Sequence, residues 1–314
     1  MRFPKARTLG LVGAGNSAPA PTLTTHYEVQ GDAGGQSFTF AGTGYTTNPA
    51  DVTVTVGGTA ATVTASTATS ITFTTPAKAA SGTGYDVVAT TAGGSATATA
   101  CVFSLPSNVS RAWYAPDYNA TAGTWVDRIA SAQVDSATTG MAKPTKTASW
   151  TNGQAGVTGT IATGLGNSST PNTLAQPGSI FFVGNATSNI ANALMFDGVH
   201  TSDQWAAYNP AGASATISLY AGGVFTSGVA IDATPALYEC LFNGASSAVA
   251  KNNGSPVTGN PGAWPLKGTY IGCNADASVG WPGSFGLFLV YGGAPSAGDK
   301  AIIHTIAQAI YGIS

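Results

Sequence analysis

Charged side chains are scarce in this 314-residue chain. They make up 8% of the residues, and the formal net charge is −2; an average globular protein has roughly 25% charged residues. Such a chain has no strong electrostatic field with which to bind nucleic acid or an anionic membrane surface, so neither partner is expected. The 43% hydrophobic content supplies real cores, and the surface must be made of Thr, Ser, Asn, Gly and Ala. This surface is typical of β-rich proteins that work outside the cytosol.

Cysteine and long apolar runs are also lacking. Cys101, Cys240 and Cys273 are odd in number and show no CxxC spacing, which argues against a disulfide framework and a zinc site. A Cys240–Cys273 bridge and buried free thiols both remain open. No apolar run approaches the roughly 18–20 residues that a membrane-spanning helix needs, so we expect no membrane insertion.

Helical periodicity is absent until the last twenty residues, and short alternating runs predict an all-β chain. We expect a first small sandwich over residues 25–105 and a short linker at 106–110. A larger sandwich follows over 111–314 and contains all six tryptophans. Strands are expected at 36–40, 51–56, 60–64, 70–74, 85–89 and 96–103, and then at 179–183, 215–220, 236–242, 268–272 and 285–291.

One helix is expected at the end of the chain. Ser296 is placed to cap it, and Asp299 adds a carboxylate near its N-terminus. Ile302, Ile303, Ile306 and Ile310 make an apolar stripe, and Gly312 supplies the stop. His304 lies off this stripe and is expected to be solvated.

Four stretches of the first block carry a family resemblance. They are GxGY at 42–45, VTVGGTAATVT at 54–64, SITFTTPA at 70–77 and GTGYDVVATTAGGSA at 82–96. The block resembles an IPT/TIG domain, an immunoglobulin-like module. The resemblance implies a spacer or interaction role, without catalytic residues to carry over.

The second block is similar to concanavalin A-like/laminin G-like domains, particularly those of phage structural proteins. The similarity rests on AWYAPDYNATAGTWVDRIA at 112–130, SIFFVGNA at 179–186, LYECLFNGASSAVAKNNG at 237–254, GTYIGCN at 268–274 and the strand–turn–helix ending from Phe285. It implies a jelly-roll sandwich closed by one helix. Residues 185–227 depart from the pattern.

Catalytic groups are not evident, and we expect no enzyme. Glycosidases of this fold need two carboxyl groups about 5–10 Å apart, but the chain has only two glutamates, Glu28 and Glu239, in different blocks, and lacks ExDxxE. Its aspartates could substitute in principle, but they are scattered among turn-forming neighbours, where Asp is favoured for local hydrogen bonding. Glu239 is expected to face solvent. No GxSxG elbow or phosphate loop is present. No cofactor or metal is expected, although segments 197–203 and 274–276 carry oxygen ligands that suit calcium.

Sugar binding needs only an exposed aromatic surface and a few polar groups. Trp205, Tyr208, Trp264 and Trp281 lie in Gly/Pro/Asn-rich segments that are typical of loops, where sandwich proteins carry function. We name these four as candidate glycan-binding residues. Core packing is the alternative for each, because large aromatics also fill cores.

The first 24 residues have two interpretations. Arg2, Lys5 and Arg7 resemble the basic region of a signal peptide, but the apolar stretch TLGLVGAG is short and broken by glycines. We therefore expect an extended arm that is retained and anchors the chain through Arg2, Phe3, Lys5, Arg7 and Leu9.

An arm, an IPT/TIG-like spacer and a lectin-like sandwich together suggest a capsid decoration protein on the outer surface of a tailed-bacteriophage virion. It would bind the major capsid protein or other virion subunits, form a homo-oligomer there and contact cell-surface glycans. The alternatives are a secreted bacterial carbohydrate-binding or adhesin protein, a glycan-cleaving enzyme, and a phage tail or fibre component.

Overall fold

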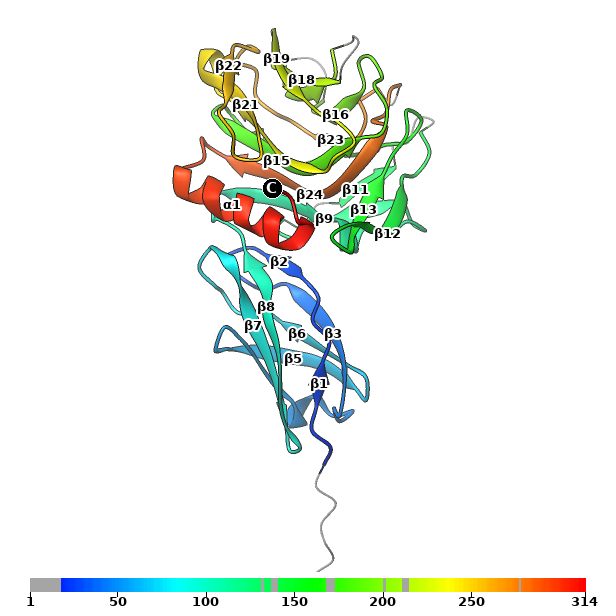
Figure 1. The fold of residues 1–314 in the computed structure, drawn as a ribbon, viewed down its shortest axis with the longest axis vertical. Helices are drawn as coiled ribbons and strands as arrows, with labels where there is room; N and C mark the ends of the chain where they lie inside the picture. Colours follow the sequence, from blue (N-terminus) through cyan, green and yellow to red (C-terminus); the bar gives the residue numbers. More distant parts are fainter. Residues whose placement is uncertain are drawn as a thin grey trace, which may run out of the picture. The chain divides into compact units, whose positions relative to one another are not determined.

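The computed structural model describes residues 18–130, 133–136, 141–167, 173–199, 202–210, 215–276 and 278–314. The fold is all-β with one C-terminal α-helix, as expected (Figure 1). The chain forms two compact units. The first comprises the described residues up to His26, with Ser37–Pro76 and Asp86–Cys101, and the second comprises Tyr27–Gln36, Ala77–Tyr85 and Val102–Ser314.

The strands of the first 105 residues form one sheet with the order β1-β3-β6-β5-β4-β7-β8-β2. Their bounds are Thr22–Leu23 (β1), Glu28–Gln30 (β2), Ser37–Thr43 (β3), Thr53–Val56 (β4), Thr59–Thr67 (β5), Ser70–Thr74 (β6), Ser81–Thr91 (β7) and Gly94–Ser104 (β8). All pairings between them whose register is resolved are antiparallel except β2 with β8. Each of the six strands expected from alternation is present.

The alternation in these strands sorts side chains onto two faces. Phe38 and Phe40 of β3 are buried with Phe73 of β6, and their rings make edge-on and tilted contacts. The intervening Thr39 is exposed and bonds to Thr72 on the neighbouring strand. Because successive side chains of a strand point to opposite faces, the sequence pattern alone gives this sheet an apolar and a hydroxyl-rich side.

The GxGY motif has a local structural reason. The Tyr45 hydroxyl donates a hydrogen bond to the carbonyl oxygen of Thr22, across the β1–β3 pair. A Cβ at Gly42 would lie 2.4 Å from this hydroxyl and 2.0 Å from the same carbonyl oxygen. Only glycine allows this close approach of ring and backbone.

The second unit contains two sheets of a sandwich. The front sheet has the order β10-β11-β14-β23-β16-β17-β18-β19, and the back sheet has the order β12-β13-β24-β15-β20-β21-β22, with β9 also pairing with β24. The front strands are Thr124–Val126 (β10), Gln133–Ser136 (β11), Leu165–Asn167 (β14), Leu194–Asp197 (β16), Ala206–Tyr208 (β17), Thr216–Tyr220 (β18), Val224–Ala230 (β19) and Thr269–Ile271 (β23). The back strands are Val109–Tyr114 (β9), Thr145–Thr151 (β12), Gln154–Thr158 (β13), Gly178–Ala186 (β15), Ala236–Phe242 (β20), Ser247–Lys251 (β21), Val257–Gly259 (β22) and Gly283–Gly292 (β24).

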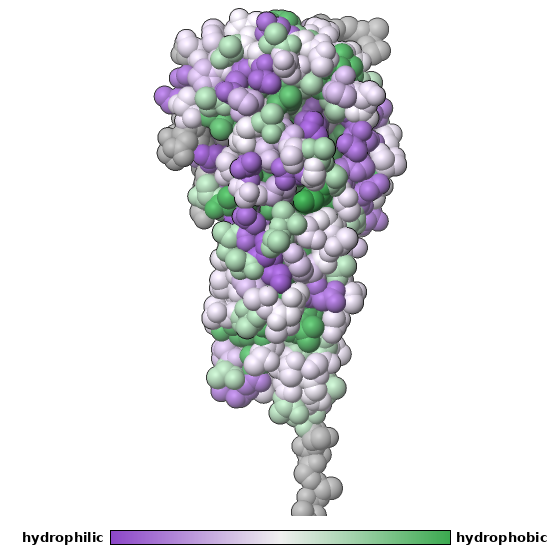
Figure 2. Space-filling view, turned by 90° about the vertical axis from the view of Figure 1, so that its left-hand side faces the viewer, coloured by the Kyte–Doolittle hydropathy of each residue, from purple (hydrophilic) through white to green (hydrophobic). Residues whose placement is uncertain are grey.

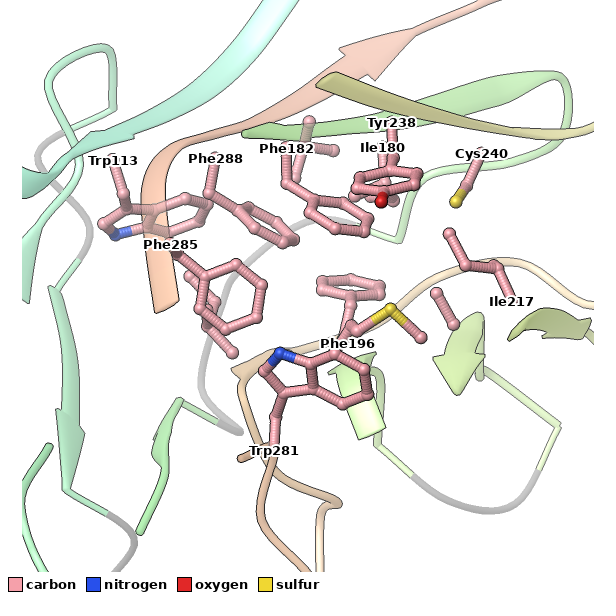
Figure 3. Close-up of a cluster of buried hydrophobic side chains, with 14 of the residues drawn as sticks. Trp113, Ile180, Phe182, Phe196, Ile217, Tyr238, Cys240, Trp281, Phe285 and Phe288 are labelled. Atoms are coloured by element: carbon pink, nitrogen blue, oxygen red, sulfur yellow. The ribbon is translucent and has the colours of Figure 1, made fainter. Parts of the chain in front are cut away.

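The core between the two sheets is aromatic. Figure 3 shows Phe182 beside Phe288 and Tyr238, in a row that faces Phe196 and Trp281. The ring centroids of Phe182 lie 5.1 Å from Tyr238 and 6.1 Å from Phe288. Pairs of this kind add about 0.5–1.5 kcal/mol each beyond the area they bury.

The middle strands of the back sheet, β15 and β24, are buried on both faces. In β15, Ile180 and Phe182 face the front sheet, whereas Phe181 and Val183 pack in a second core with the C-terminal helix α1 (Ala297–Tyr311). A strand covered on both sides needs a continuous apolar run, which explains SIFFV at 179–183.

The helix matches its sequence signals. Ser296 accepts a hydrogen bond from the backbone N–H of Asp299, and Gly312 has a left-handed φ of 65° that ends the helix. Ile303, Ile306 and Ile310 are buried against the back sheet, and Ile302 packs at the margin of the same core. His304 is half-buried rather than solvated; its Nε2 is buried, and the residue lines a small cavity with Glu239 and Lys300.

Strands begin inside two of the segments that were expected to be an arm and a linker. β1 begins at Thr22, within the residues assigned to the arm, and β9 begins at Val109, within the residues assigned to the linker. The second compact unit also includes β2 and the end of β8. The divisions at 24/25, 105/106 and 110/111 therefore stay predictions.

The surface agrees with the composition. Figure 2 shows a face on which pale, near-neutral hydropathy covers large areas between smaller hydrophilic and hydrophobic spots. Thr, Ser, Ala and Gly on outward positions produce this surface, as the low charge content requires.

Candidate functional site

Two of the four aromatic residues named from the sequence are buried. Trp205 and Trp281 are 0% and 1% exposed, so the expectation that they offer exposed rings is wrong. Trp205 stacks on Phe242 at 4.7 Å between ring centroids, and Trp281 donates its indole N–H to the carbonyl oxygen of Asn185. Both tryptophan side chains belong to the core between the two sheets.

The other two lie together with a third aromatic residue. Tyr208 is the last residue of β17, Tyr220 is the last residue of β18, and Trp264 lies in the segment before β23. All three side chains are partly exposed. We call Tyr208, Tyr220 and Trp264 the aromatic patch.

Geometry and electrostatics both show the patch as a cluster. The rings of Tyr220 and Trp264 are 5.6 Å apart and perpendicular, with an interplanar angle of 89°. Partial burial raises the pKa of Tyr208, and the neighbouring Tyr220 raises it further. The Tyr208 hydroxyl therefore stays protonated at neutral pH, where it can donate and accept hydrogen bonds.

Backbone hydrogen bonds hold the segment that carries Trp264. The backbone N–H of Trp264 donates to the carbonyl oxygen of Ala221 at 3.0 Å. The N–H groups of Ala221 and Gly223 both donate to the carbonyl oxygen of Pro261 at 2.7 Å. The Trp264 ring lies over Gly222, where a Cβ would be 2.8 Å from the indole. Gly222 also has φ of 95°, a conformation that favours glycine.

The buried Trp205 and the half-buried Gln176 hold the same segment through hydrogen bonds. The indole N–H of Trp205 donates to the carbonyl oxygen of Trp264 at 2.6 Å. The amide of Gln176 donates to the carbonyl oxygens of Gly262 and Trp264 at 3.2 and 3.0 Å, and its Oε1 accepts from the N–H of Gly244 at 2.6 Å. The patch is therefore held rigidly, although its third member sits outside a strand.

The patch has polar and apolar neighbours on the same face of the front sheet. The Ser218 hydroxyl donates to Oγ1 of Thr226 at 3.2 Å, and Val224 is 59% exposed. Ile217 and Leu219, which alternate with Ser218 and Tyr220, are buried in the core. Sequence analysis missed Tyr220, although this alternation could have identified it as an aromatic on an outward position.

The carboxylates that sequence analysis singled out are both ion-paired. Oε1 of Glu239 lies 2.7 Å from Nζ of Lys300, and burial raises the pKa of Glu239 while Lys300 opposes that shift. The Glu239 side chain is 12% exposed and does not face solvent as expected. Oε2 of Glu28 lies 2.6 Å from Nη1 of Arg128, which also binds Asp117. A guanidinium that contacts two carboxylates forms an ion-pair network.

The segments expected to suit calcium meet at Asp197. Its Oδ1 accepts from the N–H of Gly198 and from the amide of Gln204, and its Oδ2 accepts from the N–H of Ala275. His200 lies outside the described residues. Among the residues that the structure describes, no group of three or more His, Cys, Asp or Glu side chains is arranged to hold a metal ion.

The remaining candidates can be placed briefly. Arg2, Phe3, Lys5, Arg7 and Leu9 lie outside the described residues. Cys101, Cys240 and Cys273 are all buried free thiols, which answers the question of a Cys240–Cys273 bridge. Within the described part of the chain, no helix has the length and hydropathy needed to cross a membrane.

Comparison with protein families decides the nature of the first block, since the match spans residues 21–105. These residues are an IPT/TIG domain. The expected resemblance is confirmed, and Gly42 and Tyr45 of GxGY lie at the β1–β3 pair of the IPT/TIG domain. No curated protein matches the chain.

Several solved structures are similar to the chain in fold. Domain 4 of an extracellular GH43 arabinanase from Geobacillus stearothermophilus, in complex with arabinotriose, is 8% identical with a TM-score of 0.49; the match covers 63% of this chain and 98% of that one. Trypanosoma rangeli sialidase in complex with sialic acid is 9% identical with a TM-score of 0.46, over 68% and 35% of the two chains. An arabinofuranosidase complexed with arabinofuranosyl-α-1,2-xylobiose is 15% identical with a TM-score of 0.44, over 86% and 62%. The sugars named there belong to those proteins.

Proposed function

We propose that this chain is a non-enzymatic glycan-binding protein that contacts sugars through the aromatic patch. The observation that carries the proposal is the grouping of Tyr208, Tyr220 and Trp264 as partly exposed rings on the front sheet. Tyr and Trp combine an apolar face with a polar group, which suits a sugar ring with its C–H face and hydroxyls. Both side chains also offer large contact areas at a low cost in conformational entropy.

The fixed position of the patch supports the same proposal. Binding costs less when the contact residues are already in place, because fewer side chains lose freedom on association. Trp205 and Gln176 hold the backbone of Trp264, and both tyrosines lie at strand ends. Thr226 and the tyrosine hydroxyls supply hydrogen-bonding groups around the rings.

The patch can be tested with a panel of immobilised neutral and acidic glycans. Trp264→Ala and Tyr220→Ala should each weaken binding to the best glycan about tenfold, a loss of about 1.4 kcal/mol. Tyr85→Ala, which removes a half-buried tyrosine of the IPT/TIG domain, is the matched control and should leave binding unchanged. Equal binding by the wild type and both patch variants would refute the role of the patch.

The non-enzymatic part of the proposal needs its own measurement. The best-bound glycan is incubated with the wild-type protein, and new reducing ends are quantified over hours. We expect none, because Glu28 is ion-paired with Arg128 and Glu239 with Lys300, whereas a glycosidase needs two carboxyl groups that flank the scissile bond. Release of reducing ends by the wild type that is lost in Glu239→Gln would overturn the non-enzymatic part of the proposal.

The setting we propose is the outer surface of a tailed-bacteriophage virion, with the chain as a capsid decoration protein. The IPT/TIG domain and the weakly charged surface are consistent with a display role. The first 24 residues would anchor it to the major capsid protein, and copies would cluster as a homo-oligomer. A secreted carbohydrate-binding or adhesin protein is the alternative, and a tail or fibre component is a lesser one.

Hydrogen exchange distinguishes these settings. Backbone amides of residues 1–24 are compared in the free protein and in the particle or large assembly from which it comes. Protection that appears only in the assembly is expected for an anchoring arm. Free exchange in both states, or loss of these residues from the mature chain, would favour the secreted protein.

A further inference from the structure

A cavity of about 180 Å³ lies at one margin of the sandwich, apart from the residues of the aromatic patch. Its walls come from β9 and β24 of the back sheet and from the segments that precede β15 and β23. Leu174, Leu266 and Val290 give it an apolar lining. Arg111 of β9 is its one charged lining residue within the described chain.

The guanidinium of Arg111 is incompletely partnered. Its Nη1 is buried and has no hydrogen-bond partner among the described residues, and the side chain is 11% exposed. Oδ2 of Asp127 lies 3.8 Å from Nη1, beyond hydrogen-bonding distance. The Asp127 carboxylate instead accepts hydrogen bonds from the backbone N–H groups of Ala112, Ile129 and Ala130.

This arrangement leaves the buried Nη1 without a hydrogen-bond acceptor among the described residues, in a side chain that lines the cavity. A buried donor without a partner costs about 1–3 kcal/mol, more when it is charged. Arginine presents its N–H groups in a planar fork that fits the two oxygens of a carboxylate. Asp127 is held by three backbone N–H donors and does not hydrogen-bond to Arg111. A ligand carboxylate in the cavity would supply the acceptors that Arg111 lacks.

We propose that this cavity binds the carboxylate of an acidic sugar, with Arg111 as the anion-binding residue. The proposal rests on the proposed glycan-binding function and names a second, separate subsite for it. A cavity of roughly 150 Å³ accommodates a benzene ring, so about 180 Å³ accommodates a six-membered sugar ring whose substituents extend through the opening. Leu174, Leu266 and Val290 contact the ring's C–H groups, and the Ser110 hydroxyl, which donates to the carbonyl oxygen of Val290, still accepts from a sugar hydroxyl.

The test uses the full chain and four small probes in calorimetric titrations. They are methyl β-glucuronide as its sodium salt, its neutral methyl ester, neutral methyl β-glucoside and inorganic phosphate. We expect the glucuronide to bind best and the ester and glucoside to bind at least tenfold more weakly. Arg111→Gln should weaken glucuronide binding about 10- to 100-fold. Arg111→Lys keeps the charge but not the planar fork, so its affinity for glucuronide should lie between those of the wild type and Arg111→Gln.

Two features keep the result independent of folding and of the aromatic patch. In the wild type, glucuronide should protect Arg111 from phenylglyoxal, as mapped by mass spectrometry, whereas Arg128 should be unaffected by the sugar. Trp264→Ala should leave glucuronide binding unchanged, so that failure of the patch and failure of this subsite are told apart. Absence of glucuronide binding, tighter binding of phosphate than of glucuronide, or equal binding of the neutral ester would each overturn the proposal.

Discussion

The indole N–H of Trp205 donates a 2.6 Å hydrogen bond to the carbonyl oxygen of Trp264. One tryptophan is buried and stacked on Phe242, and the other is partly exposed in the aromatic patch. The core of the sandwich is thus connected directly to the surface that we propose binds sugar. A residue far from contact with a ligand is expected to affect binding through this bond.

Trp205→Phe tests this connection. The ring stack is retained, but the donor is lost, so the protein should be destabilised by about 0.5–1.5 kcal/mol. Glycan binding should weaken several-fold because the Trp264 segment is held less firmly. Chemical denaturation and binding are measured on the same preparations. Trp264→Ala provides the contrast, since it should weaken binding more while changing stability less.

Arg128 is expected to dominate the stability of the second unit. Its guanidinium contacts Glu28 at 2.6 Å, Asp117 at 2.6 Å and the carbonyl oxygen of Val29 at 2.7 Å. Removing one partner of a buried ion pair leaves the other charges unpaired, so Arg128→Met should cost about 3–5 kcal/mol. Urea denaturation measures the loss.

A matched control comes from an exposed pair. Nζ of Lys251 lies 3.2 Å from Oδ2 of Asp232, whose side chain is 55% exposed. Solvent screens such a pair, so Lys251→Met should change the free energy of unfolding by less than about 1 kcal/mol. Similar losses for Arg128→Met and Lys251→Met would contradict the importance of the buried network.

Asp299 should make the protein sensitive to acid. Hydrogen bonds from the Tyr291 hydroxyl at 2.7 Å and from Ser296 lower the pKa of this carboxyl below its ordinary value. A group whose pKa is depressed on folding stabilises the protein above its unfolded pKa, about 3.9. That contribution is lost as the pH falls through the folded value.

Thermal unfolding at pH 6 and pH 3 tests the sign. Asp299→Asn should lower the melting temperature at pH 6 but bring it closer to that of the wild type at pH 3. Tyr291→Phe, which removes the principal donor, should show part of the same pattern. A constant difference between wild type and Asp299→Asn at both pH values would argue against the assignment.

The three thiols should be unreactive in the folded protein. Cys101, Cys240 and Cys273 are 0% exposed, and burial raises the pKa of Cys240 and raises that of Cys273 to about 12. The thiolate is the reactive form, so a disulfide reagent at pH 8 should label none of them in the native protein. All three should react in guanidinium chloride without a reductant; a count of one would indicate a bridge.

Local sequence patterns determined much of this protein. Alternation predicted β3, β6 and β20, and the GxGY motif was part of the resemblance that identified the IPT/TIG domain. The N-cap at Ser296 and the stop at Gly312 were readable because capping depends on residues within a single turn. These features arise from interactions between residues close in the chain.

Only the tertiary structure decided which aromatic rings reach solvent. Trp205 and Tyr208 are three residues apart, one just before β17 and the other at its end, yet the first fills the core and the second joins the patch. The Trp205–Trp264 hydrogen bond, the Arg128–Glu28 ion pair and the long Arg111–Asp127 ion pair join residues distant in sequence. Burial and partnership of a side chain depend on which strands pack above it, and the chain's local pattern does not contain that information.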